Sequence, residues 1–260
     1  MSITLAAPAK LTRSLRIVGV RADGYHLLDA EMVSLDWGDV VTVDPGGAGL
    51  SVDGPFARGV PLDGTNLAAK ALALAGRQAA INITKRIPHG AGLGGGSADA
   101  AAVLRWAGVE DVQAAARLGA DVPFCVRGGR ARVQGIGEVI TALVDIDLAV
   151  TLVVPPLSVS TPQVYRAWDA LGGPTGHVND LEPAALVVEP ALARWRDRIA
   201  EVLGRPPVLA GSGATWFVEE DRGDLAAALP DALVVTTRTG RQHGGADGRS
   251  GGGASPRQES

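Results

Sequence analysis

The order of apolar and polar positions in the first 150 residues indicates a mixture of strands and helices. Segments rich in Val, Ile and Leu, or alternating apolar with polar side chains, favour strands, and glycine-rich stretches between them favour turns. We therefore predict strands at residues 14–20, 31–43 and 79–87, a hairpin region over 44–55, and a second hairpin over 130–143.

Helices are predicted between these strands. Residues 65–76 read as a helix with Thr65 or Asn66 as its cap and Gly76 at its end. A second helix runs from the end of a glycine-rich loop to Gly108, and a third covers residues 110–119.

After residue 150 the pattern changes to that of a small α/β sandwich. The predicted order is a buried strand at 148–156, helices at 161–172 and 190–204, a strand–turn–strand unit at 206–220, a helix at 224–230 and a strand at 232–238. We expect two domains, 1–150 and 151–239. A Gly, Arg and Ser-rich tail over 240–260 is expected to be disordered, because it cannot bury enough apolar surface to order itself.

Composition narrows the class of protein. Hydrophobic residues make up 46% of the 260 residues and aromatic residues only 4%, so the core must be aliphatic. The net charge of −4 offers no global positive field for nucleic acid or an anionic membrane. The single cysteine, Cys125, excludes an internal disulfide and is expected to be a small buried residue. With no signal peptide and no apolar run near 18 residues, a soluble cytoplasmic protein is expected.

The stretch "HGAGLGGGSADAAAV", residues 89–103, carries the strongest chemical signal. Five glycines lie within seven residues between a predicted strand and a predicted helix. Glycines allow backbone N–H groups to approach a phosphate, and the helix adds unpaired N–H groups and its dipole. Ser97 is the expected N-cap of that helix. A flexible connection would need fewer glycines, so we predict a phosphate-binding loop.

Other phosphate-binding motifs fit this loop less well. A Walker A loop would need Lys-Ser or Lys-Thr after the last glycine. Gly90, Gly92 and Gly95 match the G-x-G-x-x-G pattern of dinucleotide-binding proteins, and an acidic pair follows at Glu110 and Asp111. That pair opens a predicted helix rather than ending a second strand, so a dinucleotide-binding oxidoreductase is a weak alternative.

Three further stretches, taken together with the loop, carry a family resemblance. They are "PAKLTRSLRIVGVRADGYHLLDAEM" at 8–32, "GADVPFCVRGG" at 119–129 and "LAGSGATWFV" at 209–218. In this order and spacing the chain resembles the GHMP kinases as far as about Arg238. The resemblance implies an α+β, two-domain GHMP kinase fold with a mixed βα N-terminal domain and a ferredoxin-like C-terminal α/β sandwich. It also implies an active site in the interdomain cleft.

Among these kinases, the chain looks like the members that use ATP to phosphorylate the 2-hydroxyl of a cytidine diphosphate-linked methylerythritol. That reaction belongs to the non-mevalonate isoprenoid pathway. The resemblance implies that Asp121 accepts the hydroxyl proton and that Lys10 orients Asp121 and stabilises the transferring charge. Read without the resemblance, Asp121 could be a turn or cap residue, and Lys10 a surface lysine with a buried stem.

The resemblance also assigns binding residues. The implied ATP loop consists of Pro88, His89, Gly90, Ala91, Gly92, Leu93, Gly94, Gly95, Gly96, Ser97 and Ala98. Asn66 and Lys85 are weaker candidates near the adenine, since Asn66 could only cap its helix and Lys85 could be a solvated strand residue. Gly211, Ser212 and Gly213, within the turn 211–215, are expected to support the phosphate site, although such a turn could simply join two strands.

For the cytidine end of the substrate, the resemblance implies stacking by Tyr25 and Tyr165, hydrogen bonding by His26, and a contribution from Thr161. Tyr165 could instead pack on the core. Thr12 stands where the family usually has an asparagine that helps to hold the substrate, and it lacks the amide fork. Mg²⁺ is expected to arrive with ATP, and Ser97 is the one protein ligand that suggests itself. The sequence contains no cluster of Cys and His, so no structural zinc is expected.

Two other functions remain open from the sequence. One is a GHMP kinase for another small alcohol, of the homoserine or mevalonate type. The other is a catalytically silent GHMP-like binding protein, in which Thr12 marks a decayed substrate site; the presence of Lys10, Asp121 and the glycine loop argues against it.

Overall fold

The computed structural model describes residues 1–109, 111–174 and 176–240. The predicted tail beyond Gly240 and Glu110 of the acidic pair lie outside these residues. None of the helices that the structure describes has the length and apolar character needed to cross a membrane.

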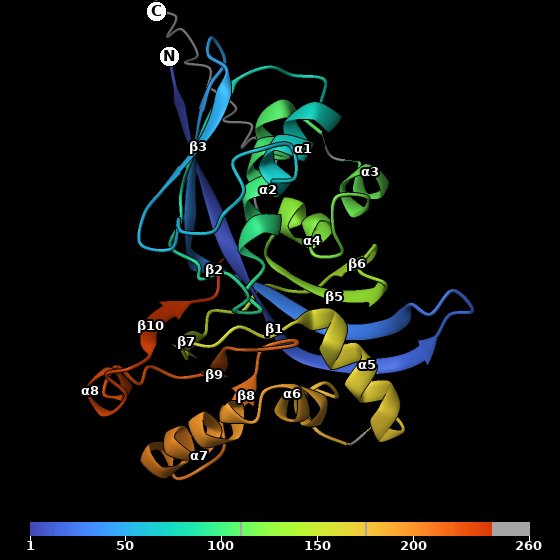
Figure 1. The fold of residues 1–260 in the computed structure, drawn as a ribbon, viewed down its shortest axis with the longest axis vertical. Coiled ribbons are helices and arrows are strands. Elements are labelled where there is room, and N and C mark those ends of the chain that lie inside the picture. The colour runs from blue at the N-terminus through green and yellow to red at the C-terminus, as the bar shows by residue number, and fades with distance from the viewer. Residues whose placement is uncertain (110, 175, 241–260) are drawn as a thin grey trace, which may run out of the picture.

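The first sheet is built on two long strands that cross the molecule (Figure 1). In the described part of the chain its strands are β1 (Ile3–Val20), β2 (His26–Asp44), β3 (Gly49–Asp53), β4 (Ala80–Thr84), β5 (Arg130–Gly135) and β6 (Val139–Ala142). Their order is β3-β4-β2-β5-β6, and β1 pairs antiparallel with β2. The second predicted hairpin, β5–β6, is confirmed.

Strand β1 begins eleven residues before the predicted strand at 14–20, since it starts at Ile3. The early part of β1, "LAAPAKL", is rich in Ala and contains Pro8, which strands usually avoid. Pairing with β2 and a register shift between Pro8 and Lys10 accommodate this segment. The sequence indicates a short apolar opening strand around Lys10, and the structure joins that segment with residues 14–20 into one strand.

The predicted hairpin at residues 44–55 is wrong. Strand β3 does not fold back on β2 but pairs in parallel with β4, with Gly49 opposite Ala80. The physical reason is that β4 already occupies the edge of β2 over Val40–Asp44, which leaves the far edge of β4 for β3.

Four helices of the first half gather beside this sheet in Figure 1. They are α1 (Leu67–Leu74), α2 (Gly95–Ala107), α3 (Val112–Ala116) and α4 (Val122–Arg127). Asn66 caps α1 by accepting a hydrogen bond from the Ala68 amide at 2.9 Å, as predicted. Helix α2 ends at Gly108 as predicted, but its N-cap is Gly94 rather than Ser97, which lies inside the first turn.

The second half forms a separate antiparallel sheet. Its strands are β7 (Ala149–Val154), β8 (Val208–Leu209), β9 (Trp216–Val218) and β10 (Leu233–Arg238), in the order β10-β7-β9-β8. Its helices are α5 (Thr161–Leu171), α6 (Glu182–Val188), α7 (Ala191–Leu203) and α8 (Leu225–Ala228). The elements follow one another as a strand, helices, two strands, a helix and a strand. This order is that of a ferredoxin-like fold and confirms the predicted sandwich.

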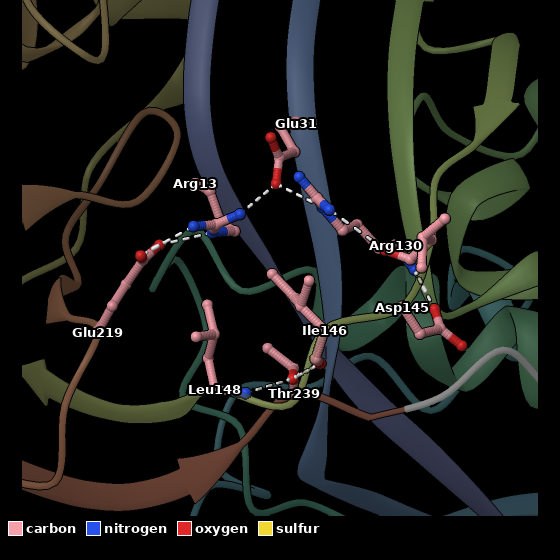
Figure 2. Close-up of polar contacts among 9 residues, drawn as sticks. Arg13, Glu31, Arg130, Asp145, Ile146, Leu148, Glu219 and Thr239 are labelled. Carbon is pink, nitrogen blue, oxygen red and sulfur yellow. Dashed lines mark hydrogen bonds and ion pairs between the residues drawn. The ribbon is translucent and has the colours of Figure 1, made fainter.

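The two halves are tied together along β1 and β2. The backbone of Leu15 exchanges hydrogen bonds with Val178 and Asp180, and the Asp180 carboxylate accepts from the Ile17 amide at 3.0 Å. Figure 2 shows a second tie, in which Arg13 lies between Glu31 and Glu219. Backbone and side-chain groups of the first half are therefore hydrogen-bonded directly to the second half.

Candidate active site

A cavity of about 1030 Å³ is lined by residues from both halves of the chain. From the first half come Lys10, His26 and the glycine loop, and from the second half come Thr161, Tyr165 and Ser212. The volume is at the upper end of what small-molecule sites need, so the cavity has room for a nucleotide and a second substrate.

The glycine loop is shaped by positions where a side chain does not fit. Gly90, Gly92 and Gly94 all have positive φ angles, +71°, +77° and +68° respectively. An added Cβ at Gly92 would lie 2.7 Å from the carbonyl oxygens of Ala210 and Gly213, so the loop sits directly on the 211–215 turn. Glycines without side chains also allow backbone N–H groups to approach a phosphate closely.

Helix α2 begins at the end of the loop without a side-chain cap. The first backbone N–H groups of a helix have no partner within the helix, and its dipole is positive at this end. Ser97 lies in this first turn, and the turn lines the cavity. The residues present therefore fit the phosphates of a nucleotide.

Lys10 and Asp121 meet beside the loop. The Lys10 Nζ lies 3.2 Å from the Asp121 Oδ2 and 3.1 Å from the Thr12 Oγ1, and Lys10 is only 6% exposed. An added Cβ at Gly94 would lie 2.7 Å from the Lys10 Cγ, so the loop packs on the lysine stem. Asp121 occupies the N-cap position of α4, yet its carboxylate makes no capping hydrogen bond and pairs with Lys10 instead.

Lys85 lies below the loop in a buried cluster of charges. Its ammonium bonds to Asp39 and, at 2.8 Å, to Asp99 Oδ2, so it is not a solvated strand residue. Burial raises the pKa of Asp99 to about 7, because the charge of Lys85 offsets the effect of burial only in part. Asp39 also accepts from the Ile87 amide at 2.8 Å, which fixes the path of the chain from β4 into the loop.

His26 is surrounded by one face of α5. Its ring lies 4.8 Å from the Tyr165 ring, stands edge-on to Trp168 at 5.4 Å, and places Nε2 2.7 Å from the Asp169 Oδ1. Tyr25, the other predicted stacking residue, is 59% exposed. All of these residues except Trp168 line the cavity, at the end formed by α5 and the β1–β2 turn.

The turn at 211–215 is held by residues from several segments. Asn179 donates to the carbonyl oxygens of Leu209 and Gly211 at 2.9 and 2.6 Å, and the Ser212 and Thr161 hydroxyls lie 2.7 Å apart. Gly211 faces Lys10: a Cβ added at Gly211 would lie 3.7 Å from the Lys10 Nζ. The turn therefore closes the cavity next to the lysine.

The structure brings most of the predicted site residues to this cavity. Asn66 and Lys85 line it too, although both side chains already have partners. Sequence reasoning missed Asp39, Asp99, Asp169 and Asn179. Asp99 had a signal, since it is a lone carboxylate in an Ala-rich run. In the described segments no three His, Cys, Asp or Glu side chains gather to hold a metal ion.

Cys125 is buried, as predicted, and its burial raises the thiol pKa to about 12. A thiol with so high a pKa stays protonated and is a poor nucleophile. Its place is in the core behind Asp121, within α4.

Comparison with known proteins agrees with the fold. Residues 65–129 match the family described as the GHMP kinases N terminal domain. The 4-diphosphocytidyl-2-C-methyl-D-erythritol kinase of Paracoccus denitrificans (strain Pd 1222) is 41% identical over 232 residues, which cover 82% of this chain and 85% of that protein. The kinase of the same name from Cereibacter sphaeroides (strain KD131 / KCTC 12085) is 37% identical and covers 92% of this chain and 95% of its own length.

A solved structure shows the same relationship in three dimensions. The crystal structure of a 4-(cytidine 5'-diphospho)-2C-methyl-D-erythritol kinase superimposes with a TM-score of 0.73 at 33% identity, covering 92% of this chain and 99% of that one. The chain therefore belongs to the GHMP kinases and, among them, to the 4-diphosphocytidyl-2-C-methyl-D-erythritol kinase family.

Proposed function

We propose that this chain transfers the γ-phosphoryl group of ATP to the 2-hydroxyl of 4-diphosphocytidyl-2-C-methyl-D-erythritol, a step in making isoprenoid precursors by the non-mevalonate pathway. The observation that carries the proposal is the Lys10–Asp121 pair, 3.2 Å apart beside the glycine loop. The names of the relatives supply the substrate, and the cavity supplies the room for it.

Asp121 accepts the proton of the substrate 2-hydroxyl while the oxygen of that hydroxyl bonds to the γ-phosphorus. The bond from that phosphorus to the bridging oxygen breaks, and ADP leaves with the bond's electrons. Lys10 faces the negative charge that develops on the transferring group, and Thr12 holds the ammonium in place. The backbone amides at the start of α2 bind the phosphates, and Gly211, Ser212 and Gly213 close that side.

ATP would bring Mg²⁺, which neutralises charge on the β- and γ-phosphates. The Ser97 hydroxyl is the candidate protein ligand, because it lies in the first turn of α2. We assign the binding of the cytidine to Tyr25, His26, Thr161 and Tyr165, which all line the cavity. We place this reaction in the cytoplasm, where a reduced Cys125 and ATP are both expected.

ADP release from ATP and Mg²⁺, with and without the cytidyl substrate, tests the proposal. Release should require the substrate, and Asp121→Asn should lower kcat by roughly 10²- to 10⁴-fold while ATP still binds, because the base is lost. Asp197→Asn, which removes an exposed carboxylate paired with Arg196 on α7, serves as the matched control and should keep full activity. Release that occurs only with homoserine or mevalonate, or a near-normal kcat for Asp121→Asn, would contradict the proposal.

A further inference from the structure

Two carbonyl groups of the glycine loop are bound by residues from the two halves of the chain. From the first half, the Lys10 amide on β1 donates to the Leu93 carbonyl oxygen at 3.0 Å. From the second half, Thr215 donates twice to the Ala91 carbonyl oxygen, through its hydroxyl at 2.7 Å and through its backbone amide at 3.3 Å. Thr215 is fully buried, and the transfer steps proposed for Lys10 and Asp121 leave it without a role.

The hydrogen bonds at Ala91 determine the direction of the amide that follows it. The Ala91–Gly92 peptide is trans, so its C=O and N–H groups point in opposite directions. Its carbonyl oxygen faces the buried Thr215, which lies behind the loop, whereas Gly92 lines the cavity. The Gly92 N–H therefore points away from Thr215, and within the described residues it donates no hydrogen bond.

The same arrangement recurs two residues further along the loop. The Leu93–Gly94 peptide is also trans, and because its carbonyl oxygen accepts from Lys10, the Gly94 N–H points away from β1. Gly92 and Gly94 both line the cavity, and α2 begins directly after Gly94. Unpaired N–H groups in such a loop bind anions, so the groups that hold its carbonyls control how a phosphate is bound.

Of the two bonds at Ala91, the one from the Thr215 hydroxyl is the shorter. We propose that Thr215 is a positioning residue, whose hydroxyl holds the Ala91–Gly92 peptide so that the Gly92 N–H faces the phosphates of ATP. The second half of the chain thus takes part in nucleotide binding through a residue that ATP does not touch. This proposal rests on the proposed function, because the ligand of the loop is taken to be ATP.

Thr215→Val removes the hydroxyl and keeps the shape of the side chain. Calorimetric titration with ATP and Mg²⁺, without an acceptor substrate, should show roughly tenfold weaker binding than the wild type, the size of one hydrogen bond. Thr215→Ser keeps the hydroxyl and should bind ATP as the wild type does. In steady-state assays of Thr215→Val the KM for ATP should rise by the same factor, and the KM for the cytidyl substrate should change little.

Thr151→Val is the matched control. Thr151 on β7 is also fully buried, and its hydroxyl donates to the Glu220 carbonyl oxygen at 2.8 Å, away from the lining of the cavity. Both valine variants lose a buried hydroxyl, so the Tm of both should fall, but only Thr215→Val should bind ATP more weakly. Thr215→Ala removes the same hydroxyl without adding a methyl group, and it replaces Thr215→Val should that variant fail to fold.

Unchanged ATP affinity in Thr215→Val would overturn the role of Thr215, as would an equal loss in Thr151→Val or in Thr215→Ser. The titrations need no acceptor, so they separate this proposal from the proposed function. A wild-type chain that binds ATP but releases no ADP with the cytidyl substrate would contradict the proposed function alone, and the same titrations would still decide the role of Thr215. A wild-type chain that binds no ATP would overturn both.

Discussion

Asp39 and Asp99 share a single ammonium group, that of Lys85, in a place from which water is excluded. Asp99 Oδ1 is buried without a hydrogen-bond partner among the described residues. Burial is the largest cause that raises the Asp99 pKa to about 7, and the neighbouring Asp39 charge adds to it. This carboxyl group therefore holds its proton in the folded chain at pH values where the unfolded chain has lost it.

The sign of the pH effect follows from this difference. Between about pH 4 and about pH 7 the free energy of unfolding should fall as pH rises, because ionising Asp99 favours the unfolded chain. Asp99→Asn removes this loss. The variant should become more stable relative to the wild type as pH rises across that window, by an amount that stays constant above it. Urea unfolding at several pH values measures the difference in free energy of unfolding between the variant and the wild type. A difference that is the same at all pH values would contradict the prediction.

Tyr165 gives a second prediction for a single residue. Removal of its ring in Tyr165→Ala takes away both the surface on which His26 packs and a candidate surface for cytosine. KM for the cytidyl substrate should rise roughly tenfold, the size of one base-stacking contact, and KM for ATP should change much less. Steady-state kinetics with each substrate varied in turn make the comparison. Tyr165→Phe keeps the ring and should behave like the wild type; a larger change for ATP would refute the stacking role.

Among the structural elements, the glycine loop and the start of α2 give the sharpest test. Gly94 and Gly76 both have positive φ angles, +68° and +60°. An added Cβ at Gly94 would meet the Lys10 stem at 2.7 Å, whereas at Gly76 nothing lies within 4 Å. Alanine at either position should cost about 1–2 kcal/mol of stability from the left-handed backbone.

Only Gly94→Ala should also displace Lys10. We expect its kcat to fall roughly 100-fold, because a misplaced catalytic group loses the orientation that speeds the reaction. Gly76→Ala, at the end of α1, should keep its kcat. Thermal unfolding and steady-state kinetics measure the two effects separately, and equal kcat values for both variants would show that the loop does not position the lysine.

The sequence predicted elements with strong local patterns and missed those that depend on distant partners. Helix α2 and the β5–β6 hairpin carry their signals in their own residues. Strand β3 could not be placed, since its partner β4 lies about thirty residues further along the chain. Helix α4 was missed because six residues with Pro123 near the start give no clear helical period. The resemblance named Lys10 and Asp121, but the pairing of His26 with Asp169, 143 residues apart, needed the fold.

At the scale of the whole molecule, the contact between the two halves includes the network in Figure 2. Arg13 on β1 bonds to Glu31 on β2 and to Glu219 after β9, and Arg130 on β5 bonds to Glu31 at 2.8 Å. The hydrogen bond with Glu219 is the largest cause that raises the Arg13 pKa. These groups are partly exposed, so solvent and salt weaken the interaction.

Glu219→Gln should lower the free energy of unfolding by no more than about 1 kcal/mol at low salt, and the loss should shrink at high salt. Asp197→Asn removes a carboxylate whose partner lies on the same helix, and should change stability even less. Urea unfolding at low and high sodium chloride makes the measurement. A loss that does not depend on salt would mean that Glu219 acts by packing rather than by charge.

Helix α5 has a consequence for how this enzyme could diverge. The proposed catalytic residues Lys10 and Asp121 lie on β1 and at the start of α4, beside the glycine loop. Thr161 and Tyr165, the proposed cytidine-binding residues of the second half, both lie on one helix of 11 residues. The proposed roles therefore assign acceptor binding and phosphoryl transfer to different stretches of the chain. We expect that replacing α5 and the β1–β2 turn with those of another kinase would change the acceptor and leave the phosphate site unaltered.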